Sequence, residues 1–224
     1  MLLRSFDIVF SLLAIIFLSP LLAIVILVLL FTGEKEVFYF QYRIGREEKP
    51  FKLLKFATML KNSENIGTGS ITVKNDSRIL PFGGFLRKTK INELPQLLNI
   101  LKGDMSIIGP RPLTQQTYDC YSDEIKSQIK KIRPGLSGIG SIVFRDEESL
   151  LSNKHDAINF YNEVISPYKG ALEVWYSKNN GISNYFKIIF ATAWLVIFPS
   201  SKLALRLFKG IPQPPEILKR KLNL

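Results

Sequence analysis

The stretch IVFSLLAIIFLSPLLAIVILVLLF, residues 8–31, decides the fold, because it contains neither a charged residue nor a glycine. As an α-helix it would extend about 36 Å, enough to cross a hydrocarbon core of ~30 Å. A helix that spans a bilayer is therefore the first interpretation. A secretory signal peptide is disfavoured, because the apolar region of such a peptide is only ~7–15 residues long.

Ser19 and Pro20, at the middle of this run, argue against a simple span. Proline removes a backbone hydrogen bond and kinks a helix, and serine can satisfy a carbonyl that the kink frees. Few residues precede the run to occupy the far side of a membrane. A bent, re-entrant helix would instead place both basic flanks on the cytoplasmic side, as the positive-inside rule prefers; these flanks hold Arg4 before the run and Lys35, Arg43 and Arg46 after it. The residues alone leave both topologies open.

The composition combines an apolar excess with a basic excess. The 224 residues carry a formal net charge of +11 and are 46% hydrophobic, which suits one domain attached to a membrane surface with anionic head groups. Phosphorylated ligands would be attracted by the same field. The chain shows no basic helix with base-reading residues and no aromatic stacking motif, so nucleic acid is not an expected partner. Cys120 is the sole cysteine, which excludes an intramolecular disulfide, and the sole histidine, His155, is assigned no role.

Outward from the apolar run, the pattern predicts short strands and helices. It indicates a strand over residues 37–42, a second over 51–59, a polar loop over 61–76, a helix over 92–102, and helical spacing over 118–132. In the helix over 92–102, Asn92 is the expected N-cap, Glu93 lies in the first turn, and Pro95 is tolerated there. The segment 185–198 is apolar on nearly all sides, so it is either an interfacial helix, the preferred interpretation, or a core helix.

Four segments resemble the bacterial sugar transferase family of small polyprenyl-phosphate phosphoglycosyl transferases. They are LRSFDIVFSLLAIIFLSP (3–20), FQYRIGREEKPFKLLKFATM (40–59), FLRKTKINELPQLLNILKGDMSIIGPRPL (85–113) and RPGLSG (133–138). The resemblance runs from Arg4 to about Lys187. Several ordered motifs over most of a chain are a far more specific signal than one short pattern.

The resemblance implies a fold and an activity. The fold is α+β and predominantly helical, with a re-entrant membrane helix at residues 1–33, broken at Ser19 and Pro20, and a cytoplasmic catalytic domain with interfacial amphipathic helices at 34–224. The expected location is the cytoplasmic face of the bacterial inner membrane, in monotopic form. The implied reaction moves a phosphosugar from a UDP-sugar to undecaprenyl phosphate and releases UMP, with Mg²⁺ and a covalent phosphosugar on a carboxylate. This step would initiate a surface glycan such as a capsule, O-antigen, exopolysaccharide or glycoprotein. The sugar is not readable from the sequence, and the oligomeric state is left open, with a homodimer as one alternative.

The chemistry itself predicts cationic side chains, because two phosphate-bearing substrates that approach each other need their charge offset. Arg87, Arg111 and Arg133 are the candidates; alternatively each caps a helix or pairs with a surface acid. Arg111 lies between two prolines, which stiffen its backbone. The resemblance implies that Arg87 and Arg111 contact phosphate, and that Arg133, Pro134 and Gly135 belong to the nucleotide region.

Asn92 and Glu93 stand where the family typically carries an Asp-Glu pair, so this chain departs from the pattern at its reactive centre. A carboxylate at a helix start can attack a phosphoryl group and bind a metal. An asparagine cannot be that nucleophile and is a weaker Mg²⁺ ligand. Glu93 and Asn92 are the expected catalytic residues, with Glu93 as the carboxylate, and both are also the expected metal ligands. The alternative is an impaired or inactive relative that binds lipid phosphate or nucleotide sugar.

Overall fold

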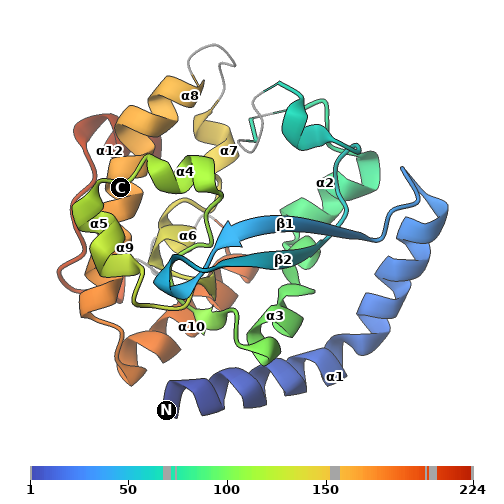
Figure 1. The fold of residues 1–224 in the computed structure, drawn as a ribbon, viewed down its shortest axis with the longest axis horizontal. Helices are drawn as coiled ribbons and strands as arrows, with labels where there is room; N and C mark the ends of the chain where they lie inside the picture. Colours follow the sequence, from blue (N-terminus) through green and yellow to red (C-terminus); the bar gives the residue numbers. More distant parts are fainter. Residues whose placement is uncertain are drawn as a thin grey trace.

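The structure, a computed structural model, describes residues 2–67, 72–73, 75–151, 157–199, 201 and 206–222. His155 and part of the predicted loop over 61–76 lie outside these residues. Helices dominate, with two small sheets (Figure 1), which confirms the predicted α+β, mainly helical class. The order of elements is α1 (Leu2–Phe31), β1 (Phe38–Ile44), β2 (Pro50–Phe56), α2 (Pro81–Lys88), α3 (Gln96–Lys102), β3 (Ser106–Ile108), α4 (Gln115–Asp119), α5 (Asp123–Ile129), β4 (Gly135–Ser137), α6 (Ile139–Val143), α7 (Glu147–Leu150), α8 (Ala157–Phe160), α9 (Ser166–Lys178), α10 (Ile182–Ile197) and α12 (Glu216–Leu222).

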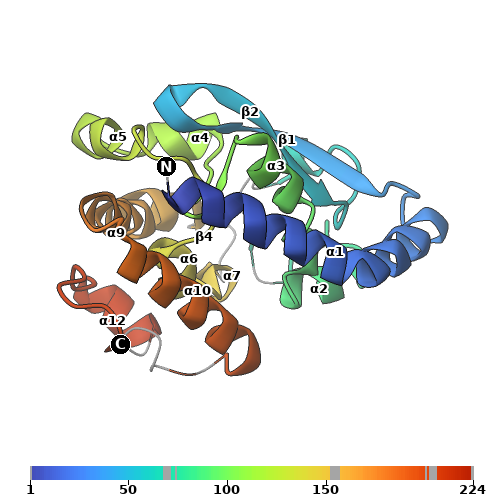
Figure 2. The same ribbon diagram turned by 90° about the horizontal axis from the view of Figure 1, so that it is seen from below.

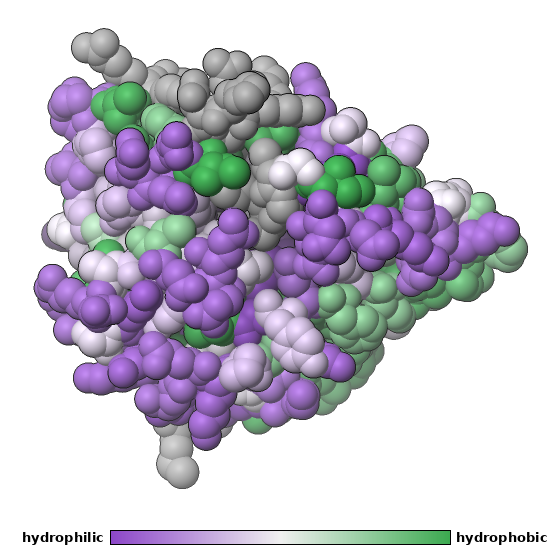
Figure 3. Space-filling model, turned by 45° about the horizontal axis from the view of Figure 1, so that its top comes forward, coloured by the Kyte–Doolittle hydropathy of each residue, from purple (hydrophilic) through white to green (hydrophobic). Residues whose placement is uncertain are grey.

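Helix α1 is a single bent helix that contains Pro20. The hydroxyl of Ser19 donates a hydrogen bond to the carbonyl of Ile16 at 2.8 Å, as expected where a proline disturbs the helical ladder. Among the described residues, α1 is a helix long and apolar enough to cross a membrane. Of its apolar side chains only Val25 and Leu29 are buried, and many are exposed. Figure 3 shows the resulting hydrophobic surface along its lower right edge, where Figure 1 places α1. This exposed surface indicates membrane association; the re-entrant topology stays a prediction.

The first turns of α1 are anchored to the rest of the chain. Arg4 donates hydrogen bonds to the carbonyls of Ile100 and Leu101, at 2.6 and 3.0 Å, at the end of α3. One carboxylate oxygen of Asp7, a residue only 2% exposed, accepts three hydrogen bonds. The donors are the Ser106 hydroxyl, the Ile107 backbone N–H and the Tyr185 hydroxyl, each at 2.9 Å. Asp7 thereby ties α1, β3 and α10 together (Figure 2).

Replacing Asp7 with alanine is expected to lower the free energy of unfolding by about 3 kcal/mol, because three buried donors lose a charged acceptor at once. Thermal unfolding followed by circular dichroism in detergent measures the effect. The matched control is Asp123→Ala, since the Asp123 side chain is fully exposed, and its effect should stay within ~0.5 kcal/mol. Equal melting temperatures for the two variants would refute the anchoring role.

Strands β1 and β2 form an antiparallel hairpin that pairs Phe38 with Phe56 and Ile44 with Pro50. Both predicted strands are confirmed, with slightly shifted bounds. Side chains alternate across a strand, so Tyr39, Gln41 and Arg43 share one face of β1. That face lines a cavity described below, and the hairpin therefore builds one wall of the site.

Two predicted helices differ from the structure. The helix expected from Asn92 begins only at Gln96, with Pro95 as its N-cap residue; Asn92 and Glu93 lie in a preceding 3₁₀ turn, Ile91–Glu93. Because Pro95 has no N–H to donate four residues back, the chain makes tighter i→i+3 turns before the α-helical ladder starts. The predicted N-cap role of Asn92 is therefore wrong.

The helical segment expected over 118–132 is two helices, α4 and α5. The side chain of Ser122 accepts a hydrogen bond from the backbone N–H of Ile125, at 3.4 Å. A new N-cap at this point starts a separate helix. The uninterrupted helical spacing of the sequence did not reveal the break.

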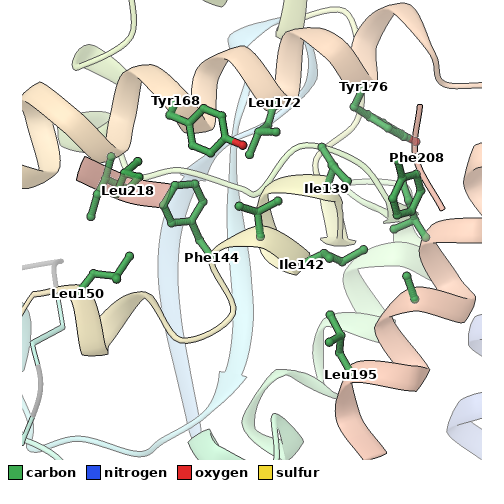
Figure 4. Close-up of a cluster of buried hydrophobic side chains, with 14 of the residues drawn as sticks. Ile139, Ile142, Phe144, Leu150, Tyr168, Leu172, Tyr176, Leu195, Phe208 and Leu218 are labelled. Carbon is green, nitrogen blue, oxygen red and sulfur yellow. The ribbon is translucent and has the colours of Figure 1, made fainter. Parts of the chain in front are cut away.

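The largest core cluster lies among α6, α9 and α10, with α12 and α7 at its edge (Figure 4). In Figure 4, Tyr168, Leu172 and Tyr176 of α9 face the side chains of α6. One face of α10 packs into this cluster, whereas the other exposes large apolar side chains. The buried side chains of α10 are Tyr185, Ile188, Ala191 and Leu195, and the exposed ones include Phe186, Phe190, Val196 and Ile197. The segment is thus a core helix on one face, and the placement of its other face in a membrane interface stays a prediction.

Candidate functional site

Two cavities meet at a group of charged side chains. One has a volume of about 760 Å³ and the other about 1100 Å³. Four residues line both: Lys90, Glu93, Arg111 and Arg145. Their shared position makes this group the point where two ligands, one from each cavity, would touch.

The two cavities differ in chemistry. The smaller runs between α1 and α10, and apolar side chains such as Phe10, Ala14, Leu18, Phe186 and Ile189 line it. We call it the apolar cavity. The larger, called here the polar cavity, lies against the inner face of the β1–β2 hairpin and α2. Its lining includes the cationic side chains of Arg43, Lys55, Arg87, Lys88, Lys90, Arg111 and Arg145.

Glu93 is the carboxylate at the junction. Its side chain is 15% exposed and lies 3.7 Å from the Lys55 ammonium and 3.4 Å from a guanidinium nitrogen of Arg111. Burial alone raises the pKa of Glu93, but the charges of Arg111 and Lys55, ahead of two further cations, outweigh burial and lower the pKa to about 2. Glu93 is therefore ionised at physiological pH. The predicted place of Glu93 in the first turn of a helix is wrong, because α3 begins three residues later.

Lys55 and Arg43 are site residues that the sequence analysis did not single out. Burial lowers the pKa of Lys55 to about 7, with Glu93 opposing this shift and Arg43 and Arg111 adding to it. Near neutral pH Lys55 is thus only partly protonated, and Arg111 is the constant partner of Glu93. Burial lowers the pKa of Arg43 to about 10, helped by the charge of Arg111. The alternation of side chains along the predicted strand 51–59 was the signal for Lys55, since it places every second residue on the inner face. Arg43 lies one residue beyond the predicted strand 37–42, because β1 extends to Ile44.

Arg111 is held by its backbone as well as by Glu93. Its N–H donates to a carboxylate oxygen of Glu173 on α9, at 3.4 Å, and Glu93 raises the pKa of the guanidinium. Burial raises the pKa of Glu173 to about 7, although the Arg111 N–H works in the opposite direction. Arg111 therefore lies beside Glu93, and the predicted contact of Arg111 with phosphate stays a prediction.

The segment Arg133–Pro134–Gly135 packs against the start of the loop that carries Arg111. Strands β3 and β4 pair in parallel, and a Cβ on Gly109 would come within 2.3 Å of the Arg133 carbonyl, whereas one on Gly135 would lie 2.1 Å from the Gly109 nitrogen. Only glycine permits this approach. Arg133 donates to the Gly103 carbonyl at 3.0 Å. None of these three residues lines either cavity, so their predicted role in nucleotide binding has no contact here to support it.

Arg87, in the last turn of α2, lines the polar cavity as predicted. One of its guanidinium nitrogens donates to the hydroxyl of Thr72 at 3.0 Å. Arg87 also contributes to the low pKa of Glu93. Both predicted phosphate ligands, Arg87 and Arg111, are thus near the same carboxylate.

Asn92 lies beside Glu93 but is only 5% exposed. It lines the polar cavity and not the apolar cavity. Its amide oxygen is buried and accepts no hydrogen bond from the residues that the structure describes. Such an oxygen next to a carboxylate fits Mg²⁺, which is usually held by one or two protein oxygens together with substrate phosphates. Within the same part of the chain, His, Cys, Asp and Glu side chains form no group of three that could hold a metal by themselves.

The arrangement defines a class of protein: a membrane-associated protein whose cationic cleft joins an apolar cavity beside its membrane helix. The cations outnumber the carboxylates of the polar cavity, which suits a polyphosphate. The bacterial sugar transferase family matches residues 1–199. The chain therefore belongs to this family, as the sequence motifs predicted.

Individual relatives agree with this assignment. The chain is 36% identical over 160 residues to the exopolysaccharide production protein ExoY of Sinorhizobium fredii, covering 65% of this chain and 70% of that protein. It is 32% identical over 208 residues to the undecaprenyl-phosphate galactose phosphotransferase of Salmonella typhimurium, covering 87% of this chain and 40% of that protein. It is also 32% identical over 194 residues to the UDP-glucose:undecaprenyl-phosphate glucose-1-phosphate transferase of Escherichia coli, covering 85% and 39%. The chain thus spans less than half of the last two proteins.

Proposed function

We propose that this protein transfers a phosphosugar from a UDP-sugar to undecaprenyl phosphate, releasing UMP, as the first membrane step in the synthesis of a surface glycan. The observation that carries the proposal is the junction of a cationic polar cavity and an apolar cavity at Glu93 and Arg111. Relatives are named for this reaction with glucose and galactose. Because the family and the site agree, an inactive binding relative is the less favoured alternative.

The two cavities separate the two substrates by polarity. The nucleotide and the diphosphate of a UDP-sugar suit the polar cavity, where Arg43, Arg87 and Arg111 offer bidentate donors. The polyprenyl chain suits the apolar cavity, which lies between α1 and α10, two helices with exposed apolar faces. The lipid phosphate would then lie beside Lys90, Arg111 and Arg145.

Glu93 is the group that performs the transfer. A carboxylate oxygen of Glu93 forms a bond to the phosphorus that carries the sugar, while the bond from that phosphorus to the oxygen of UMP breaks and UMP leaves with the electron pair. An oxygen of undecaprenyl phosphate then bonds to the same phosphorus, and the bond to Glu93 breaks. Arg87 and Arg111 offset the negative charge on the phosphoryl oxygens in both steps.

Magnesium would be held by Glu93 and the amide oxygen of Asn92, together with phosphate oxygens of the substrate. When bound, it would reduce the repulsion between the phosphates and Glu93.

The test of this function is UMP release in detergent with Mg²⁺, undecaprenyl phosphate and a panel of UDP-sugars. We expect release that depends on both substrates. UMP formation without the lipid, beyond one equivalent per protein, would indicate hydrolysis rather than transfer. Absence of release from every UDP-sugar would refute the proposal.

We further propose that α1 is re-entrant and that the protein is monotopic at the cytoplasmic face of the inner membrane. The support is the bend of α1 and the Ser19–Pro20 pair within it. In a Cys120→Ser background, single cysteines at Ser5, which is exposed, and at Glu34, which is partly exposed, should resist an impermeant maleimide added to intact cells and react after lysis.

A cysteine at the exposed Glu163 provides the cytoplasmic reference for this labelling experiment. Labelling of the Ser5 site in intact cells, with the Glu34 site protected, would instead show a spanning helix. Pro20→Leu should raise the labelled fraction at the Ser5 site, because it restores a helical hydrogen bond.

A further inference from the structure

We infer that Glu64, held by Tyr39 and Gln41, forms the subsite that recognises the hydroxyl groups of the sugar. The inference rests on the proposed function and deepens it by naming the residues that would select the sugar. All three residues line the polar cavity. The sequence analysis assigned no binding role to any of them.

One cross-strand pair of residues links the subsite to the reactive carboxylate. Tyr39 pairs across the hairpin with Lys55, and the Lys55 ammonium is 3.7 Å from Glu93. Directly paired side chains on one face of a hairpin are about 5 Å apart. A hexose ring whose phosphate sits at Glu93 would therefore extend to the hydrogen bonds between Tyr39 and Glu64.

The Glu64 carboxylate is oriented although it is exposed. The Tyr39 hydroxyl and the Gln41 amide both donate to the same oxygen, Oε2, at 3.1 and 3.2 Å. Burial, together with the charge of Glu64, raises the pKa of Tyr39 to about 12, so Tyr39 stays a donor at physiological pH. Because both bonds end on Oε2, the other oxygen, Oε1, remains for a donor on a ligand.

The buried side chain of Arg78 fixes the turn that carries Glu64. Arg78, only 4% exposed, donates to the carbonyls of Ser63 and Ile66, both at 2.8 Å. It is itself held by Asp76 through an ion pair of 2.6 Å. An exposed carboxylate on a clamped turn, tied by two side chains, is pre-organised for a ligand rather than merely solvated.

The chemistry of these groups selects the ligand. A carboxylate accepts hydrogen bonds from sugar hydroxyls and repels another carboxylate. Gln41 adds a neutral amide, whose oxygen accepts from Arg43. A neutral hexose or N-acetylhexosamine fits this wall of the cavity.

The test compares wild type, Glu64→Gln and a matched control, Glu47→Gln, by UMP release with neutral UDP-hexoses and with UDP-glucuronate. Glu47 lies in the hairpin turn with an exposed side chain and lines neither cavity. For the best neutral substrate, Glu64→Gln should lower kcat/KM about tenfold, while product inhibition by UMP, which lacks the sugar, stays unchanged. Relative activity with UDP-glucuronate should rise in Glu64→Gln only.

The outcomes separate the subsite from the function. If wild type releases UMP but Glu64→Gln matches it with every sugar, the subsite is wrong and the transferase stands. If wild type releases no UMP from any sugar, the proposed function fails and this inference fails with it.

Discussion

Glu93→Gln is expected to lower the rate of UMP release by about 10⁴-fold or more, because the amide removes the nucleophile while keeping the shape of the side chain. Glu93 is the carboxylate that borders both cavities and contacts Lys55 and Arg111. Its low pKa keeps it ionised. Asn92, in contrast, lines only one of the two cavities, the polar cavity.

The measurement pairs UMP release with the intact mass of the protein after exposure to a UDP-sugar without lipid. The parent should gain one phosphosugar, and Glu93→Gln should gain none. Glu163→Gln, an exposed position outside both cavities, is the control and should behave like the parent. If the parent is silent while Asn92→Asp gains both turnover and the adduct, then the nucleophile belongs at position 92, and this chain is an inactive form.

Arg111→Ala is expected to lower kcat/KM about 10³-fold without unfolding the protein, because it removes a fixed cation from the charge that develops on the phosphoryl group. The structure gives two reasons for this size. Arg111 borders both cavities and places a constant charge 3.4 Å from Glu93. Lys55, which also contacts Glu93, is only partly protonated near pH 7.

Arg111→Lys should recover only part of the activity, since it keeps the charge but loses the two-pronged geometry of the guanidinium. Arg46, which is exposed and outside both cavities, serves as the control: Arg46→Ala should leave kcat/KM unchanged. Melting temperatures of the Arg111 variants test folding. A folded Arg111→Ala protein with parental turnover would refute the role of Arg111 in phosphate binding.

The sequence was sufficient for the family, for the apolar helix and for the first two strands. Each of these depends on local pattern: a charge-free run, a period of two along a strand, and motifs whose order is fixed. The same local reasoning failed at Asn92, where it predicted a helix cap. Pro95 interrupts the α-helical hydrogen bonds at this point, so that α3 starts only at Gln96. Local sequence allows a proline either in the first turn of a helix or just before the helix, and the tertiary contacts of the segment decide between the two.

The sequence did not reveal the structural use of the glycine in RPG. This segment was expected to belong to a nucleotide site, which stays a prediction, and its glycine also allows β4 to approach Gly109 next to the loop that presents Arg111. A close approach of two backbones leaves the same sequence signature as a ligand site, because both require a residue without a side chain.

By itself, the sequence determined that this chain has a membrane-seeking helix, a mainly helical α+β domain and the motifs of a bacterial sugar transferase. Only the tertiary structure decided that Lys55 and Arg111 meet Glu93, that Asn92 caps nothing, and that Glu64 is held by the hairpin. The physical reason is that periodicity reports how each segment folds locally. The pKa values and ion pairs of a site instead depend on distances between segments that are far apart in the chain, and packing alone sets those distances.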